Sequence, residues 1–477
     1  MLGIAYGPYN TPGDYTPEQF GYNKKPLSGT RPLLTLLRSP NPDRGVADFQ
    51  SLLFGPGTPN LDSLFRSVSQ ERFRFSNAGI YAVPRPDIPG EVEGQPLAAS
   101  LQLAQQQGFD LSRYDVNGDR VVNENELTIL WVYDARGGQT NYNDSCPWMG
   151  GQVCWKGFLA GMGEDGALDL YAHELLHSVS QNAIDNLYGA GCRSERLTLM
   201  SCSTWTGGPI DASDRVAYHL DPYYKMLVGW AKPAIAAMNT PGACASIRAP
   251  SAGWGYRPVL IPDPTNLNRF LMMEFRSATP AGGVANTDRD VAGGYGVAIW
   301  YYERNAEGNL AEVPAGGGDG RDGAGWSIGA PDGARGGTTL WRAEHGQFRI
   351  GPSRLTPLSA WAPLTMRVGP ASPSSSVGEI DWWPTGLQHR WRIDTADSVV
   401  ARGGQLQLSG LLGMLRSNTR ARLINDAGVS HELPVITWSC GKATVTVPSN
   451  VPPGSYYLSI AETSTADGSN RLRILVS

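Results

Sequence analysis

The stretch Asp169-Leu-Tyr-Ala-His173-Glu174-Leu-Leu-His177-Ser-Val179 is the strongest indication of fold and chemistry in this chain. Residues four apart lie on the same face of an α-helix, so the imidazoles of His173 and His177 would point at one metal ion. Glu174 would then lie beside the open coordination position, where a water molecule binds. The spacing therefore predicts a zinc site with Glu174 as general base, and hence peptide hydrolysis.

A surface helix whose two histidines bind nothing is the alternative explanation of this motif. The flanking residues argue against it, because they would bury the helix, and buried histidines need partners. These flanking residues are Leu168, Leu170, Leu175, Leu176 and Val179.

The composition indicates a large protein rich in strands. At 477 residues the chain should form roughly three domains of ~150 residues each. Charged residues make up only 17%, whereas glycine (58), proline (35) and tyrosine (19) are abundant, which is typical of short strands joined by tight turns. The net charge of −5 and the lack of a long basic run argue against a nucleic-acid partner. No run of 18 apolar residues occurs, so we expect no membrane span.

The placement of the six cysteines suits an oxidising environment. Short spacing favours the pairs Cys146–Cys154 and Cys192–Cys202, which leaves Cys244 and Cys440 either to pair across domains or to stay free. Six reduced, buried thiols are the alternative. The first ten residues lack the features of a signal peptide. We therefore expect that the numbering begins after a removed leader and that the protein is extracellular.

Hydrophobic periodicity divides the chain into four parts. We expect an irregular arm over residues 1–30, a peptidase domain over 31–235, a β-rich domain over 236–391 and a small sandwich over 392–477. Strands are expected at 33–37 and 127–133, a strand pair at 270–275 and 295–302, and helices at 60–70 and 96–108.

A catalytic zinc ion needs a third protein ligand. Many secreted peptidases extend the motif to H-E-x-x-H-x-x-G-x-x-H/D, but here the glycine position is Ser180 and the third-ligand position is Ala183, which cannot bind a metal. The nearest carboxylate, Asp185, fits if the loop is two residues longer. Glu195 and His219 are the alternatives. Tyr188 and Tyr218 are candidate hydrogen-bond donors to an oxyanion, although most such tyrosines are structural.

Several segments on both sides of the predicted zinc-binding helix resemble the sequence pattern of one protein family. They lie at 29–37, 53–57, 63–69, 199–201, 219–230, 273–276 and 296–300. Together with the His173–His177 helix they resemble the immune inhibitor A family of secreted zinc metallopeptidases, which is metzincin-like, over about residues 29–302. The segment 443–458 resembles an immunoglobulin-like module of the IPT/TIG type.

The resemblance implies an α+β fold, in which a metzincin-like zinc peptidase domain precedes β-sandwich domains and a C-terminal immunoglobulin-like sandwich. It also implies an extracellular endopeptidase with catalytic zinc and structural calcium. Met200 lies where metzincins place a methionine-containing turn beneath the metal, although an ordinary core methionine is the alternative. The chain departs from the family pattern at Ser180 and Ala183, which leaves the third ligand open.

The segment 115–126 has the ligand spacing of an EF-type calcium loop. The predicted ligands are the side chains of Asp115, Asn117, Asp119, Asn123 and Glu126 and the backbone carbonyl of Val121. Arg120 takes the place of the usual glycine, and a strand follows the single copy, so we expect a structural calcium rather than a regulatory pair. An acidic turn that caps the next element is the alternative. For Asp319, Asp322 and Asp332, a solvated loop is the simpler explanation than a second cation site.

The sequence thus predicts a monomeric, secreted zinc endopeptidase that hydrolyses protein substrates. His173, His177 and Asp185 would bind zinc, and Glu174 would act as general base on a zinc-bound water. Two alternatives stay open. One is a non-catalytic or glycan-directed surface-binding protein on a degenerate peptidase scaffold, which Ala183 favours. The other is a peptidase selective for glycoproteins.

Overall fold

The structure is a computed structural model and describes residues 15–38, 44–57, 59–84, 95–133, 138–144, 146, 153–187, 197–201, 215, 217–236, 243–253, 255–263, 266–278, 288, 291, 294–310, 312–313, 322–323, 325–327, 340–350, 364–385, 391–415, 418–462 and 469–477.

The described part of the protein is mostly β: 43% of these residues lie in strands and 19% in helices. The predicted α+β fold built on a metzincin-like domain is therefore wrong. That prediction gave most weight to the helical spacing around His173 and to a family likeness. Long alternating segments farther along the chain contribute far more residues to the fold, and they form strands.

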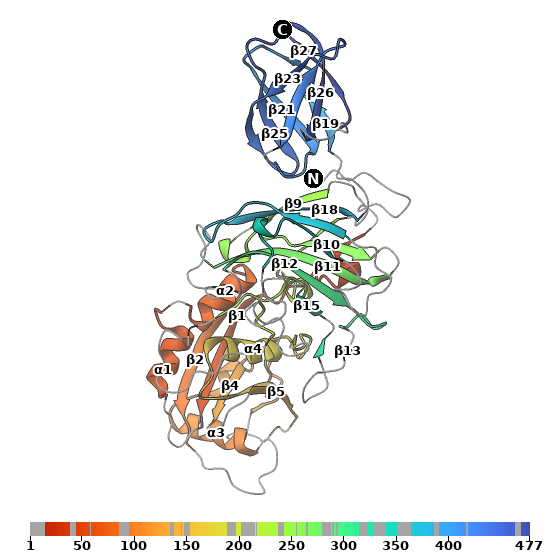
Figure 1. Cartoon of the computed structure of the whole chain (residues 1–477). Coiled ribbons are helices and arrows are strands. Elements are labelled where there is room, and N and C mark those ends of the chain that lie inside the picture. The colour runs from red at the N-terminus through yellow and green to blue at the C-terminus, as the bar shows by residue number, and fades with distance from the viewer. Residues whose placement is uncertain are drawn as a thin grey trace.

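The N-terminal third of the chain forms a five-stranded sheet in the order β2-β1-β4-β7-β5 (Figure 1). Its strands are β1 (Gly29–Leu37), β2 (Phe73–Ala82), β4 (Thr128–Tyr133), β5 (Gly138–Asn143) and β7 (Gly157–Gly163). The first four strands of that order are parallel, and the edge strand β5 runs antiparallel to β7.

Both faces of this sheet are covered by helices, which is why its central strands are continuous apolar runs. The helices are α1 (Val46–Phe54), α2 (Leu61–Ser69), α3 (Gln95–Gln106) and α4 (Leu168–Val179). The short helix α5 (Pro222–Leu227) packs against strand β11 (Asn266–Ser277) instead. Leu33 and Leu37 face the hydrophobic cluster that includes residues of α1, α2 and α4. Leu34 and Leu36 point the other way, into a second cluster with residues of α3.

The middle of the chain contributes two further sheets that pack face to face. One has the order β15-β12-β11-β10-β8 and the other β16-β17-β18-β9. Their strands are β8 (Ala234–Ile235), β9 (Ala243–Arg248), β10 (Val259–Asp263), β11 (Asn266–Ser277), β12 (Tyr295–Glu303), β15 (Gly325–Ser327), β16 (Gln347–Ile350), β17 (Leu364–Val368) and β18 (Val377–Pro384).

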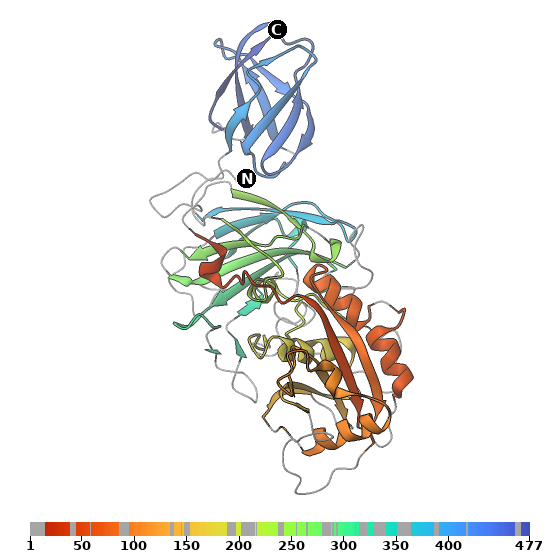
Figure 2. The same ribbon diagram turned by 180° about the vertical axis from the view of Figure 1, so that it is seen from behind.

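Strand β11 is buried on both faces. Phe270 and Met272 belong to the hydrophobic cluster of the N-terminal sheet, whereas Leu271 and Met273 belong to the cluster between the two middle sheets. Because side chains alternate along a strand, one strand joins the two cores. Figure 2 shows the same layers from behind, with the middle sheets lying across the end of the N-terminal unit.

The C-terminal residues form a two-sheet sandwich around their own hydrophobic cluster. Its sheets have the orders β19-β21-β25-β24 and β20-β27-β26-β22-β23. The strands are β19 (Arg392–Ala396), β20 (Val399–Val400), β21 (Gln405–Leu411), β22 (Thr419–Ile424), β23 (Ser430–Leu433), β24 (Val435–Trp438), β25 (Lys442–Thr446), β26 (Gly454–Glu462) and β27 (Leu472–Val476).

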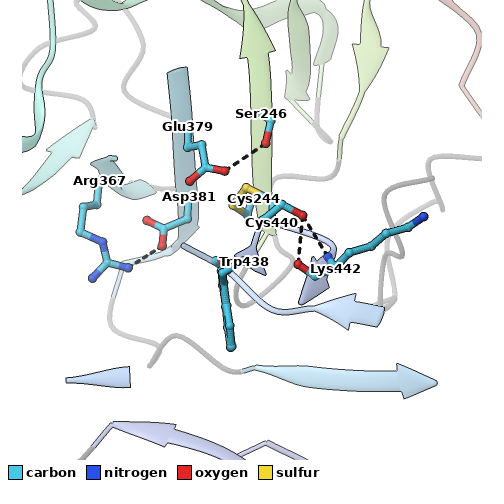
Figure 3. Close-up of a disulfide and its surroundings, with 10 residues drawn as sticks. Cys244, Ser246, Arg367, Glu379, Asp381, Trp438, Cys440 and Lys442 are labelled. Carbon is cyan, nitrogen blue, oxygen red and sulfur yellow. Dashed lines mark hydrogen bonds and ion pairs between the residues drawn. A yellow bond between two sulfur atoms is a disulfide. The ribbon is translucent and has the colours of Figure 1, made fainter. Parts of the chain in front are cut away.

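A disulfide links this sandwich to the middle sheets (Figure 3). Cys244 on β9 is bonded to Cys440, just before β25, across 196 residues of sequence. The bond packs against Met414 in a small buried cluster. The sequence left Cys244 and Cys440 either paired or free. The structure shows them paired across the two regions.

The remaining regular elements are short. They are the pairs β3 (Val121–Val122) with β6 (Cys154–Trp155) and β13 (Glu312–Val313) with β14 (Asp322–Gly323), and 3-10 turns at Pro17–Phe20, Leu111–Tyr114, Pro250–Ala252 and Ala343–His345. The predicted Cys146–Cys154 disulfide is present. Within the described ranges, none of the helices has the length and apolar character needed to cross a membrane.

Candidate metal centre

The motif histidines lie on α4, and every residue of this helix is buried. Three contacts fix the helix against β7 and the residues that follow it. The Tyr171 hydroxyl lies 3.1 Å from the carbonyl oxygen of Gly163 and 2.9 Å from that of Glu164, and the Ser178 hydroxyl donates to the Phe158 carbonyl at 2.7 Å. The helix therefore presents its histidines in fixed positions.

The two imidazoles are held in the same tautomer. Nδ1 of His173 donates to the carbonyl oxygen of Leu199 at 2.8 Å, and Nδ1 of His177 donates to that of Ile184 at 2.7 Å. A carbonyl oxygen only accepts, so each Nδ1 carries its proton and each neutral ring presents a lone pair at Nε2. Burial lowers the pKa of both groups, that of His177 to about 4, so the neutral form is favoured.

These lone pairs converge on one point. Nε2 of His173 and Nε2 of His177 are 3.2 Å apart, and Oδ1 of Asn186 lies 2.9 Å from the first and 3.0 Å from the second. Neighbouring ligand atoms of a tetrahedral zinc ion, at Zn–N distances near 2.0–2.1 Å, are about 3.3 Å apart. The donor set and its spacing fit a small divalent cation.

The chain reaches this point through a turn that the motif pattern did not predict. Ser180, the expected glycine position, keeps right-handed helical backbone, and Gln181 and Asn182 adopt φ of 56° and 57° instead. Two consecutive left-handed residues reverse the chain, and asparagine tolerates this region better than most residues. The return loop is therefore longer than the pattern assumes, and Ala183 is exposed.

The predicted third ligand, Asp185, lies in this return loop. Its side chain is exposed, and its backbone N–H donates to the Tyr224 hydroxyl at 3.0 Å. The side chain in contact with both imidazoles belongs to the next residue, Asn186. Of the two alternatives, Glu195 lies outside the described residues, and His219 is fully buried in a different cluster.

Glu174 is held by the edge strand β5. Thr140 directs its hydroxyl towards Oε2 of Glu174, at 2.9 Å, and towards the Glu174 backbone carbonyl, at 2.8 Å. A Cβ at Gly138 would lie 3.0 Å from both Cγ and Oε1 of Glu174, so the strand can approach this closely because glycine is there. Burial raises the pKa of Glu174, and the neighbouring His177 opposes that rise.

Met200 ends the described turn at 197–200, and this turn is directly attached to the site. The side chain is fully buried, and its carbonyl oxygen accepts from Leu187 N–H at 2.8 Å, which ties the turn to the return loop. The Leu199 carbonyl in the same turn holds His173. The sequence placed Met200 near the metal, but it gave no sign that the neighbouring backbone orients a ligand.

His219 belongs to a fully buried polar group, here called the charge cluster: His219, Lys225, Glu274, Arg276 and Asp288. Arg276 contacts Glu274 at 3.0 Å and Asp288 at 2.9 Å, and it also donates to the Leu197 carbonyl at 2.7 Å. Nζ of Lys225 lies 3.2 Å from Nδ1 of His219. Strand β11 thus holds the turn that orients His173.

The predicted calcium loop closes on itself in the structure. Oε1 of Glu126 accepts from Val116 N–H, and its Oε2 accepts from Asn123 N–H. Oδ1 of Asp115 is buried without a hydrogen-bond partner among the described atoms. Arg120 adopts φ of 70°, so it takes the left-handed conformation that glycine usually provides.

Several predicted residues cannot be placed at the site. Tyr188, Cys192, Cys202, Asp319 and Asp332 lie outside the described residues. Tyr218 is described and is buried. In the described part of the chain, no group of three His, Cys, Asp or Glu side chains is arranged to hold a metal ion. The trio of His173, His177 and Asn186 contains only two such side chains, because its third member is an amide.

Comparisons with known proteins do not assign the chain to a family. No protein-family model matches it, and no curated protein matches it. Among solved structures, it is similar to a "Putative bacterial DNA binding protein" from Bacteroides vulgatus, with 12% identity, a TM-score of 0.16, and coverage of 24% of this chain and 69% of that one. A likeness this weak supports no conclusion about fold or function.

Proposed function

We propose that this protein is a zinc-dependent endopeptidase that acts outside the cell. The observation that supports it most is the pair of Nε2 atoms 3.2 Å apart, with both Nδ1 protons committed to carbonyl oxygens. Two lone pairs that face each other at this distance repel unless a cation lies between them. The likeness of the His173–His177 helix to immune inhibitor A peptidases, and the disulfides, point the same way.

Each residue then has a separate role. His173 and His177 bind the ion through Nε2, while the carbonyls of Leu199 and Ile184 keep their rings in the required tautomer. Zinc, when bound, polarises the scissile carbonyl and acidifies its water. Glu174 takes a proton from the attacking water at a carboxylate oxygen and later gives it to the leaving amine. Thr140 holds that carboxylate in place.

The experiment is a digest of an unbiased peptide library by zinc-loaded protein and by Glu174→Gln. Glutamine keeps the size and the Thr140 contact but cannot accept the proton, so we expect cleavage to fall by about 10²–10⁴-fold. Zinc content, measured by elemental analysis, should not change. Wild-type cleavage by Glu174→Gln would refute the general-base role. No zinc in either protein, even after incubation with zinc, would refute the metal site itself.

A surface-binding protein without catalysis is the second candidate. The observation that favours it is that, over the described ranges, no trio of His, Cys, Asp and Glu is arranged for a metal. The same digest separates the two candidates. A binding protein leaves every peptide of the library intact, and loading with zinc does not change that result.

We also propose a structural calcium ion in the loop 115–126. The buried, unpartnered Oδ1 of Asp115 supports it, since such an atom is costly unless a cation or donor meets it. Calcium should raise the melting temperature of the wild type, and Asp115→Asn should reduce that rise. Asp144→Asn is the control, because Asp144 pairs with Lys156 at the surface. An equal calcium response in all three proteins would contradict the proposal.

A further inference from the structure

Asn186 occupies the place where a third zinc ligand is needed. Its Oδ1 is 2.9 Å and 3.0 Å from the two Nε2 atoms. Together the three atoms make a nearly equilateral triangle, since the third side is 3.2 Å. All three are acceptors in the observed arrangement, so no proton is available for a hydrogen bond between any two of them. A cation bound to all three would relieve this repulsion.

The geometry points to Asn186, in place of Asp185, as the third ligand of a neutral His-His-Asn zinc site. This inference rests on the proposed zinc site but not on the peptidase activity. The backbone explains how a residue nine positions after His177 arrives there. The left-handed pair Gln181 and Asn182 turns the chain back, and the Ile184 carbonyl is then fixed by His177.

The return loop is anchored on both sides of Asn186. The Asp185 N–H donates to the Tyr224 hydroxyl at 3.0 Å, and Leu187 N–H donates to the Met200 carbonyl at 2.8 Å. Tyr224 and Met200 are both fully buried, so the loop is tied to the core at two points. This leaves the Asn186 side chain held between two anchors, as a preorganised ligand needs.

A neutral ligand set has a consequence for regulation of the site. Two imidazoles and one amide do not offset any of the charge of a divalent ion, whereas a carboxylate ligand would offset one unit. Zinc should therefore be held less tightly than in a site with an aspartate ligand. Occupancy of the site would then follow the zinc concentration around the protein.

A hydrogen-bonding role is the competing explanation. If the amide were rotated by half a turn, its NH2 group could donate one N–H to each Nε2 atom, and the trio would be satisfied without a metal. The two explanations differ in whether position 186 lies within bonding distance of a bound ion. A thiolate at that position reports this directly, because it is a strong ligand for such ions.

The test uses cobalt(II) as a spectroscopic probe in Asn186→Cys and in the matched control Asp185→Cys. Both variants add one thiol to the same loop, so any disulfide exchange affects them alike, and thiol titration shows that the added cysteine is free. We expect a thiolate-to-cobalt charge-transfer band in Asn186→Cys alone. A band in Asp185→Cys alone, or in neither variant while the wild type binds cobalt, would overturn the inference and leave the zinc site standing.

Affinity gives a second readout that does not depend on cysteine. Asn186→Asp should bind zinc about tenfold more tightly or better in competition with a chelator, because the ligand gains a charge. Asn186→Leu should bind it about tenfold more weakly or worse. Unchanged affinity in both variants would refute Asn186 as a ligand. A wild-type protein that binds neither zinc nor cobalt would instead refute the proposed metal site.

Discussion

Two groups of polar side chains contact the turn at 197–200, and they differ in which kinds of atoms face each other. In the charge cluster, donors face acceptors: Arg276 meets Glu274 and Asp288, and Lys225 meets Nδ1 of His219. At the metal centre, three acceptor atoms face one another. Both groups contain buried histidines, but the first is held by ion pairs, whereas the second brings neutral acceptor atoms together.

This is the difference that we expect between a structural cluster and the proposed metal site. Buried charges persist when they are paired, as Arg276 is with Glu274 and Asp288. Acceptor atoms that lie this close together repel one another unless a cation or a donor joins them. The two groups are also coupled, because Arg276 holds Leu197 while the Leu199 carbonyl holds His173. The following variants test whether the two groups really differ in this way.

Replacing one histidine in each group should give the largest difference, and the quantity compared is zinc affinity. His173→Ala removes a ligand, so zinc affinity should fall roughly a thousandfold or more. His219→Leu should leave the affinity within about twofold, because His219 contacts Ser67 and Lys225 rather than the metal centre. Competition with a chelator measures both variants. A comparable loss of affinity in His219→Leu would show that the two groups do not differ in their contribution to metal binding.

Breaking the ion pairs of the charge cluster should be the next largest effect. Arg276→Met leaves two buried carboxylates without their cation, so the free energy of unfolding should fall by about 3–5 kcal/mol. Arg74→Met, which breaks the surface pair of Arg74 with Asp62, should lower it by about 0–1 kcal/mol. Urea denaturation of both variants measures the difference. Equal effects would mean that the buried pairs are no more important than surface ones.

The pH dependence of stability tests the charge cluster through its lysine. Burial lowers the pKa of Lys225 to about 7, although the nearby carboxylates of Glu274 and Asp288 oppose this, as Asp221 does. Between about pH 7 and 10.5 the unfolded chain holds this proton more than the folded one does, so the unfolding free energy rises with pH. Lys225→Met should flatten that rise in denaturation curves. An unchanged slope would mean that the buried lysine stays charged.

Local pattern was enough to predict several elements, including the helix that carries the candidate site residues. The predicted strand pair at 270–275 and 295–302 is the antiparallel pair β11 and β12, and the helix expected at 60–70 is α2. His173, Glu174 and His177 do share one buried helix. Such features depend on spacing within one element, which the sequence displays directly. The Cys146–Cys154 bond also follows from short spacing.

The fold class and the position of Asn186 beside the two imidazoles could not be predicted in this way. The family likeness suggested α+β, but the balance of strands and helices depends on pairing between distant segments. The contact of Asn186 with both imidazoles was not predicted, because the motif pattern fixes the turn at position 180. The chain instead turns at Gln181 and Asn182, and a conformation of this kind has no strong sequence signal outside glycine.

The sequence by itself determined that two imidazoles share one face of a helix and that a carboxylate follows the first of them, since a helix places residues four apart on the same side whatever surrounds it. Only the tertiary structure determined which groups contact these side chains. The carbonyls of Leu199 and Ile184, the hydroxyl of Thr140 and the amide of Asn186 come from separate turns and strands. Their convergence depends on long-range packing, and that is set by the whole folded chain rather than by any local stretch.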